Sequence, residues 1–298
     1  MKITVIISAH RKGRELECVL TGYAMQTRPP DQIIIAQDGV DSSIAAAIET
    51  VQRRGHRLPL LHQTQEQRGF GKFRALNRAI LAASGDLLLF TDGDCVPRND
   101  FVDSYLRLMA PGMFLAGGSH VSIPEAYHLR HDLLEAVRDQ SLFAYDFLAA
   151  IPGFCKSAMR LTRHRPLARL LDRITQRNAF SGSNSCAWRE DVLDVGGFDE
   201  AMAYGGGDLN IGLRLNHIGV RGRRARHTLV SIHLDHERSY YCAEKERANH
   251  DWNRQVRRQR IVLPRLSQIR QLEGARSSTR FFRTGIRQAA AELLARFD

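Results

Sequence analysis

The sequence has no run of uncharged apolar residues long enough to cross a bilayer. A membrane-spanning helix needs about 18 to 20 such residues, and the most apolar stretch, 141–154, is interrupted by Asp146 and Pro152. No signal peptide is predicted, because the short apolar run 3–7 is followed by three basic residues before residue 15. We therefore expect a cytoplasmic chain that does not span the membrane, with residues 3–7 as a buried first strand.

Paired cysteines are also lacking. The five cysteines are scattered, odd in number and never arranged as C-x-x-C (Cys18, Cys95, Cys155, Cys186, Cys242). This pattern argues against a disulfide framework and against a zinc–thiolate site. We expect reduced thiols without a catalytic role.

Acidic residues are scarce in two segments, which makes the chain basic overall, with a net charge of +11. Residues 156–177 hold seven basic residues and one acid, and residues 251–298 hold eleven arginines and four acids. Such segments bind nucleic acid, bind anionic lipid, or form a solvated helical face. The tail has too few aromatic residues for base stacking, so we expect no nucleic-acid partner. An anionic membrane surface, at the inner face of the cell membrane, is the predicted partner.

Short apolar runs alternate with segments of helical period over the first 120 residues. Strands are predicted at 5–7, 32–36, 58–62 and 86–90, and helices at 15–25, 43–53 and 73–83. Unbroken Ile and Leu runs joined by helices are typical of a parallel sheet buried on both faces. The predicted fold class is α/β, with a mostly parallel nucleotide-binding sheet flanked by helices.

The second half of the chain is predicted to carry two helical additions. Residues 125–178 are mostly helical in period and indicate a helical insert. The α/β pattern resumes at Phe180, with a helix at 208–218 and a strand at 228–232. We expect one domain over residues 1–240, including the insert, and a basic helical extension over residues 241–298.

Acidic residues follow two of the predicted strands. Asp38 comes after the strand at 32–36, and Asp92-Gly93-Asp94 after the strand at 86–90. Ligands of open parallel sheets bind beyond the carboxyl ends of the strands. Asp38-Gly39 also fits a simple turn. The two carboxylates of Asp92 and Asp94 repel each other, which favours Mg²⁺ or Mn²⁺ shared with substrate phosphates.

Two glycine-rich segments add to this pattern. Residues 69–77 contain Lys72 and Arg74, which could offset phosphate charge or contact a base, but they match neither a P-loop nor G-x-G-x-x-G. Residues 205–208, Gly-Gly-Gly-Asp, begin a predicted helix. Asp208 at that position is either a functional carboxylate or only an N-cap.

These and other motifs follow one another in a particular order. The series is Ser8-Ala9-His10-Arg11, Asp38-Gly39, Ala75-Leu76-Asn77, Asp92-Gly93-Asp94, Gly182-Ser183-Asn184 with Trp188-Arg189, Gly197-Phe198-Asp199-Glu200, and Gly206-Gly207-Asp208 with Leu213-Arg214-Leu215. It resembles the family 2 glycosyltransferases of the GT-A fold, with a second half similar to the galactosyltransferase carboxy-terminal region. The resemblance covers residues 1–120 and 178–240.

The resemblance implies an inverting transfer of a sugar from a nucleotide diphosphate sugar to a hydroxyl. The donor is expected to be a UDP-sugar, and the acceptor a glycan or a lipid-linked acceptor in polysaccharide biosynthesis. By the same likeness, Asp38 accepts a hydrogen bond from the base and Asp92 faces the ribose. The other residues assigned to the nucleotide sugar are Ser8, Ala9, His10, Arg74 and Gly93.

The resemblance also implies a divalent metal ion that bridges the two phosphates. Asp94 is the expected ligand, and a histidine after the last core strand completes the site. His233 is preferred and His236 is the second choice, although a histidine pair is also common at protein surfaces. One carboxylate and one imidazole favour Mn²⁺ over Mg²⁺.

Asp208 matches the catalytic base of the family's Gly-Glu-Asp motif, and Gly206, Gly207 and Trp188 match acceptor-binding positions. The family's glutamate is here Gly207, so acceptor preference is not inherited. Two alternatives remain open. A nucleotidyltransferase of similar α/β fold would need a glycine-rich loop after the first strand, where residues 8–11 supply none. The other is a non-catalytic protein that binds nucleic acid or an anionic surface.

Overall fold

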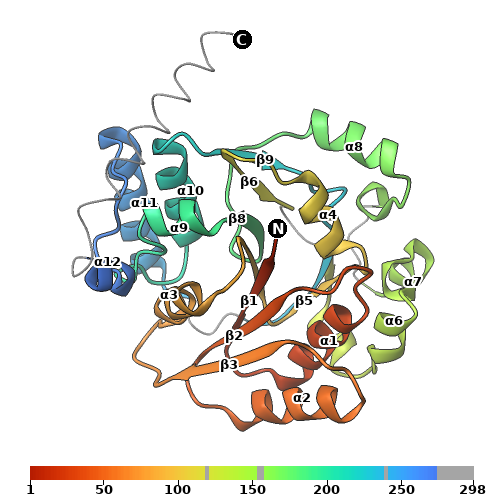
Figure 1. Cartoon of the computed structure of the whole chain (residues 1–298). Coiled ribbons are helices and arrows are strands. Elements are labelled where there is room, and N and C mark those ends of the chain that lie inside the picture. The colour runs from red at the N-terminus through yellow and green to blue at the C-terminus, as the bar shows by residue number, and fades with distance from the viewer. Residues whose placement is uncertain (118–120, 153–157, 238–240, 274–298) are drawn as a thin grey trace.

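Two sheets lie at the centre of the computed structural model, which describes residues 1–117, 121–152, 158–237 and 241–273 (Figure 1). The larger sheet has the strand order β3-β2-β1-β4-β8-β6-β9, and the smaller has the order β5-β10-β7. The strands of the larger sheet are β1 (Ile3–Ala9), β2 (Gln32–Asp38), β3 (Leu60–Gln65), β4 (Leu87–Asp92), β6 (Met113–Ala116), β8 (Asn184–Trp188) and β9 (Arg221–Arg224). Those of the smaller sheet are β5 (Cys95–Pro97), β7 (Val121–Ile123) and β10 (Ser231–Leu234).

Helices cover both faces of the larger sheet (Figure 1). One face packs against α1 (Gly13–Ala24), α2 (Ser42–Arg53) and α4 (Phe101–Leu108). The other packs against α3 (Lys72–Ala82), α9 (Arg189–Asp194), α10 (Gly207–His217) and α12 (Gln268–Glu273), with α11 (Ala243–Gln259) beside α10.

Alternation along the central strands explains this layering. Ile3, Val5 and Ile7 of β1 face the core under α1 and α2, whereas Ile6 faces the core under α3 and α10. Successive side chains of a strand point to opposite faces, so an unbroken apolar run supplies both cores. The expected α/β fold with a mostly parallel sheet is confirmed: β1 pairs in parallel with β2 and β4, and β2 with β3, while β8 is antiparallel to both of its neighbours.

The predicted insert consists of short helices. They are α5 (Glu125–His128), α6 (Leu134–Arg138), α7 (Tyr145–Ala149) and α8 (Arg165–Ile174), with 3-10 turns at Ser141–Phe143 and Ala158–Leu161. Arg14 of α1 donates to the carbonyls of Leu129 and His131, which ties the insert to the first helix. No helix in the described part of the chain is long and apolar enough to cross a membrane.

Both predicted ends of the strand at 228–232 are wrong, which changes the position of His233. The strand predicted at 228–232 is β10, Ser231–Leu234. Residues 225–229 instead form a turn closed by a hydrogen bond from Leu229 N to Ala225 O of 2.8 Å. His233 therefore lies within a strand, paired with Cys95 of β5, and does not follow it.

The described part of the carboxy-terminal extension packs onto the core. Helix α11 lies against α10, and α12 lies against α3. Residues 274–298, and Lys156 of the basic insert, are outside the described residues. The division of the chain at residue 240 stays a prediction.

Candidate active site

The carboxyl ends of β1, β2 and β4 bring the predicted nucleotide-binding residues together. Ser8 pairs in register with Asp92, and Ala9 with Gln37 beside Asp38. The Gly93 N–H donates to Ser8 O at 2.8 Å. Chain-distant residues therefore share one edge of the sheet, as the strand order predicts.

Asp38 is fixed more firmly than a simple turn would require. Its buried carboxylate accepts hydrogen bonds from Gln65 Nε2 at 3.0 Å and from Gly71 N at 2.8 Å. Its backbone carbonyl lies 2.6 Å from His10 Nδ1. The simple-turn alternative is thus insufficient, because the side chain joins the ends of β2 and β3 to the start of α3.

Lys72 is the basic residue that the fold brings to the Asp-x-Asp motif. Its ammonium lies 2.6 Å from Asp92 Oδ1. Burial disfavours the charged form, but Asp92, Asp208 and Asp94 outweigh it, so the pKa of Lys72 is raised. Arg74, two residues further along α3, is exposed. Lys72 is therefore the cation that contacts Asp92, and the assignment of Arg74 to the nucleoside stays a prediction.

Asp94 is surrounded by three basic groups. Its carboxylate oxygens lie 3.6 Å from His233 Nε2, 3.1 Å from His236 Nε2 and 3.6 Å from Lys12 Nζ. Burial would raise the pKa of Asp94. The hydrogen bond from His236 and the charges of His233 and Lys12 outweigh burial and hold that pKa well below its ordinary value.

The residues around Asp94 fit a divalent transition-metal ion. Ligand atoms of Asp94, His233 and His236 all lie within 4.8 Å of one another. Burial lowers the pKa of His233, which favours the neutral imidazole that can coordinate a metal ion. A second grouping joins Asp92, Asp94 and Cys95, but burial raises the pKa of the Cys95 thiol, which disfavours a thiolate ligand. The mixed oxygen and nitrogen donor set suits Mn²⁺.

Asp208 lies in the first turn of α10 and does not cap it. The N-cap is Gly206, which has a left-handed backbone with φ of 80°. The capping alternative for Asp208 is therefore wrong. Burial raises the pKa of the Asp208 carboxyl, and Lys72 and a backbone hydrogen bond from Gly182 oppose that rise. Gly182 can approach the carboxylate so closely because it has no Cβ. A Cβ at this position would overlap the carboxylate.

Gly207 has a steric reason to differ from the family's glutamate. A Cβ at this position would overlap the ring of Phe73. That ring stacks on Phe198 with centroids 5.5 Å apart, so it has little room to move. A side chain at residue 207 is excluded by the packing of α3 against α10.

Trp188 is not part of this cluster. It pairs in register with Leu87, at the opposite end of β4 from Asp92. Its indole N–H donates to Ala110 O at 2.9 Å. The structure thus gives Trp188 a packing role at the far end of the sheet, because an antiparallel β8 carries it away from the site.

The loop before Asp208 is held by α11, which sequence reasoning treated only as a basic tail. The buried Asn249 Nδ2 donates to three successive carbonyls of that loop (Ala203 at 3.0 Å, Tyr204 at 3.2 Å and Gly205 at 2.8 Å). Asn253 Nδ2 donates to Gly206 O at 2.8 Å. The two amides, four residues apart on one helix face, fix the backbone on which Asp208 is mounted.

A second chain of contacts links this loop to the Gly-Phe-Asp-Glu motif. Asn210 Nδ2 donates to Asn253 Oδ1 at 2.9 Å, and Arg214 Nε donates to Asn210 Oδ1 at 2.8 Å. The fully buried Arg214 also donates to the carbonyls of Val195 and Gly197. Paired asparagines at this spacing in a charged helix are the signal that could have revealed the role of α11.

Comparison with known proteins gives a family match and one curated relative. A family model described as glycosyl transferase family 2 matches residues 4–194. The uncharacterized glycosyltransferase YfnE of Bacillus subtilis is 25% identical over 284 residues, which cover 84% of this chain and 69% of that protein.

Solved structures share the fold at low sequence identity. The mannosyltransferase PcManGT of Pyrobaculum calidifontis, solved with GDP-Man and Mn²⁺, has a TM-score of 0.54 at 17% identity, covering 88% of this chain and 61% of the other. TarS 1–349 of S. aureus in complex with UDP-GlcNAc has a TM-score of 0.53 at 13% identity, covering 80% and 60%. GalNAc-T7 with UDP, GalNAc and Mn²⁺ has a TM-score of 0.59 at 14% identity, covering 86% and 48%. The chain spans less than two thirds of the length of each.

These neighbours share the GT-A architecture expected from the sequence. The family match ends at residue 194, so the likeness of the second half to the galactosyltransferase carboxy-terminal region stays a prediction. Because the match covers more than half of the 298 residues, the chain belongs to glycosyl transferase family 2.

Proposed function

We propose that this enzyme transfers a sugar, with inversion, from a UDP-sugar to a hydroxyl of a glycan or lipid-linked acceptor in polysaccharide biosynthesis. One observation carries the proposal: Asp92, Asp94, Lys72 and Asp208 form one charged cluster at the carboxyl edge of the sheet. The family match favours a glycosyltransferase over the nucleotidyltransferase and the non-catalytic binding protein.

The donor is proposed to bind along the ends of β1, β2 and β4. Asp38 and the backbone from Ser8 to His10 would hold the nucleoside, with Asp92 at the ribose and Gly93 beside it. Lys72 offsets the carboxylate charge that would otherwise repel a diphosphate. The UDP and UDP-GlcNAc bound to two structural neighbours support a uridine donor, while the GDP-Man of the third keeps guanosine as the alternative to test.

Asp94, His233 and His236 are proposed to hold Mn²⁺ in preference to Mg²⁺. The ion, when bound, would supply Lewis-acid stabilisation of the negative charge on the departing diphosphate. The Mn²⁺ in two neighbouring structures supports this assignment.

Asp208 is proposed as the general base. A carboxylate accepts the proton of the acceptor hydroxyl while the oxygen attacks the anomeric carbon from the face opposite the leaving diphosphate. The burial that raises the pKa of Asp208 makes it a stronger base than an exposed aspartate. Gly206 and Gly207, next to this carboxyl, are proposed to border the acceptor.

We also propose that the enzyme acts at the inner face of the cell membrane, bound to its anionic surface. The net positive charge of residues 156–177 and 251–298 supports this location. Each Lys or Arg near such a surface contributes about 1 kcal/mol.

A donor screen tests the proposed reaction. The full-length chain is incubated with Mn²⁺ and a panel of UDP- and GDP-sugars, and the released nucleotide is identified. We expect UDP release from one UDP-sugar above all others, and a product whose anomeric configuration is opposite to that of the donor by NMR. Release of UMP with sugar 1-phosphate, or retention of configuration, would contradict the proposal.

A further inference from the structure

A second charged cluster lies at the other end of the β5–β10 ladder from Asp94. Leu234 N–H donates to Asp94 O at one end, and Arg98 N–H donates to Val230 O at the other. Beyond Arg98, a recess lies between α4 and α8. Its volume is about 370 Å³, which includes open solvent at its mouth. Five of its lining residues are arginines and one is an acid (Arg98, Arg107, Arg163, Arg165, Arg169 and Asp100).

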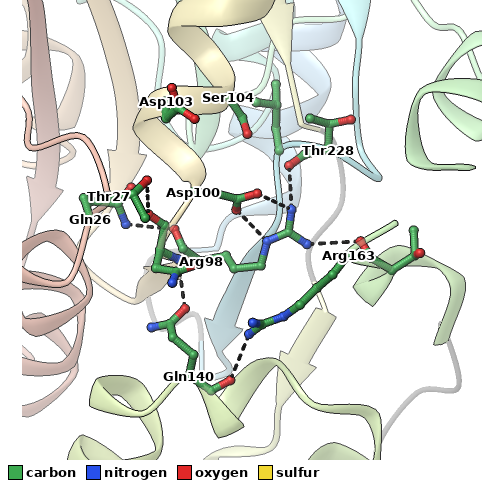
Figure 2. A network of polar contacts seen from close by, with 12 residues as sticks. Gln26, Thr27, Arg98, Asp100, Asp103, Ser104, Gln140, Arg163 and Thr228 are labelled. Atoms are coloured by element: carbon green, nitrogen blue, oxygen red, sulfur yellow. Dashed lines mark hydrogen bonds and ion pairs between the residues drawn. The ribbon is translucent and has the colours of Figure 1, made fainter. Parts of the chain in front are cut away.

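Arg98 forms the inner wall of this recess and is held in place by hydrogen bonds. Arg98 is 4% exposed, and its Nε and Nη2 donate to the two carboxylate oxygens of Asp100 at 2.6 and 3.1 Å. Nη2 also donates to Thr228 O at 3.2 Å (Figure 2). Since both oxygens of Asp100 are used by Arg98, this acid does not compensate the other arginines.

The backbone around Arg98 is held from two sides. Gln26 Nε2 donates to Arg98 O at 2.8 Å, and Asn99 N donates to Gln140 Oε1 at 2.9 Å. Arg163 reaches Gln140 O from the insert (Figure 2). Elements far apart in the sequence thus build the recess, which favours a formed site over a loose surface patch.

Arg165 and Arg169 lie at positions in α8 where a positive charge is electrostatically unfavourable. Arg165 is the first residue of α8, at the positive end of the helix dipole, and the first turn holds no acid. Arg169 follows at the i+4 position, where like charges repel. Arg107 is paired with Asp103 at 2.7 Å, but neither Arg165 nor Arg169 has an ion pair with any acid in the described ranges. An anion between them would remove both penalties.

More positive charge lies next to α8. The carbonyl of Arg224 accepts from Gln176 just after α8 at 2.9 Å. Burial, and then the charges of Arg226, Arg177 and Arg160, lower the pKa of Arg224. These arginines raise the local positive potential, which attracts multivalent anions.

We propose that the recess between α4 and α8 binds a phosphate group. Arginine guanidinium groups match phosphate oxygens in geometry and charge, and Ser104 and Thr162 belong to the same lining. The phosphate is either a lipid headgroup or part of a soluble phosphate ester. The site is separate from Asp94 and Asp208, so its failure would leave the proposed transferase reaction untouched.

The test compares two double variants of the full-length chain. Arg165→Gln with Arg169→Gln removes two exposed recess charges and keeps helix propensity. Arg53→Gln with Arg57→Gln makes the same charge change at exposed positions at and after the end of α2, on the other side of the molecule (Figure 1). Inorganic pyrophosphate is titrated by calorimetry in EDTA. Flotation is measured with vesicles of phosphatidylglycerol and phosphatidylcholine against phosphatidylcholine alone.

We expect the recess variant to bind pyrophosphate about ten-fold more weakly than the control variant. If the source is a lipid headgroup, flotation with phosphatidylglycerol falls in the same variant and pyrophosphate competes with it. If the source is a soluble ester, the calorimetric loss appears without a change in flotation. Equal affinity and equal flotation in the two variants, both with unaltered thermal unfolding, would overturn the site and leave only diffuse attraction.

Discussion

The two central carboxylates, Asp94 and Asp208, are held in opposite ways. Asp94 sits at a strand end among the basic side chains of Lys12, His233 and His236, and its pKa is lowered. Asp208 sits on a helix whose preceding loop is held by neutral amides, and burial raises its pKa. Neighbouring carboxyl groups whose pKa values are pushed apart take different chemical roles. The contrast supports the proposed roles of Asp94 in cation binding and of Asp208 in proton acceptance.

The largest effect is expected when the charge of Asp94 is removed. Asp94→Asn keeps the size of the side chain but removes its charge, so metal-dependent nucleotide binding should be lost. Calorimetry with UDP, with and without Mn²⁺, measures this loss. Glu49→Gln, an exposed acid of α2, is the matched control. Full Mn²⁺-dependent affinity in Asp94→Asn would remove Asp94 from the metal site.

The next effect concerns the support of the Asp208 loop. Asn249→Ala leaves three loop carbonyls without their donor, which should cost about 1 to 3 kcal/mol of unfolding free energy. Because the loop positions Asp208, kcat should fall while the KM for the donor stays unchanged. Gln255→Ala, exposed on the same helix, is the control. A purely structural role would lower the melting temperature and leave the kcat of the folded fraction intact.

The smallest effect is expected for Lys72, whose charge acts on the Asp208 carboxylate. The charge of Lys72 lowers the pKa of Asp208, so Lys72→Met should raise that pKa. The base works only when ionised, and the acidic limb of the kcat–pH profile should therefore move to higher pH, by about one unit. Lys72→Arg keeps the charge and should keep the profile at saturating donor. A shift to lower pH in Lys72→Met would contradict the geometry.

The strand-end half of the site could be predicted because its signals are local. An apolar run followed by Asp38 or by Asp92-Gly93-Asp94 marks a strand and its carboxyl end within ten residues of sequence. Parallel pairing then brings those ends to one edge, as the register of Ser8 with Asp92 shows. Local pattern and sheet geometry together were sufficient there.

The Asp208 half depends on contacts between distant segments, which periodicity does not encode. The Asn249 contacts with the loop span more than 40 residues, and the overlap that excludes a side chain at Gly207 involves Phe73. Trp188 was misplaced because the antiparallel direction of β8 was not visible in its sequence. The preference for His233 over His236 came from a predicted strand end that is two residues off, and the structure brings both histidines to Asp94.

The most direct test of the two roles is the turnover of Asp208→Asn, measured together with its affinity for UDP and Mn²⁺. The amide keeps the shape of the side chain but cannot accept the acceptor's proton. Turnover should fall by about 10² to 10⁴, with UDP affinity and melting temperature unchanged. Turnover equal to that of the unaltered enzyme, or a loss of UDP affinity that accounts for the whole defect, would contradict the assignment of Asp208 as the base.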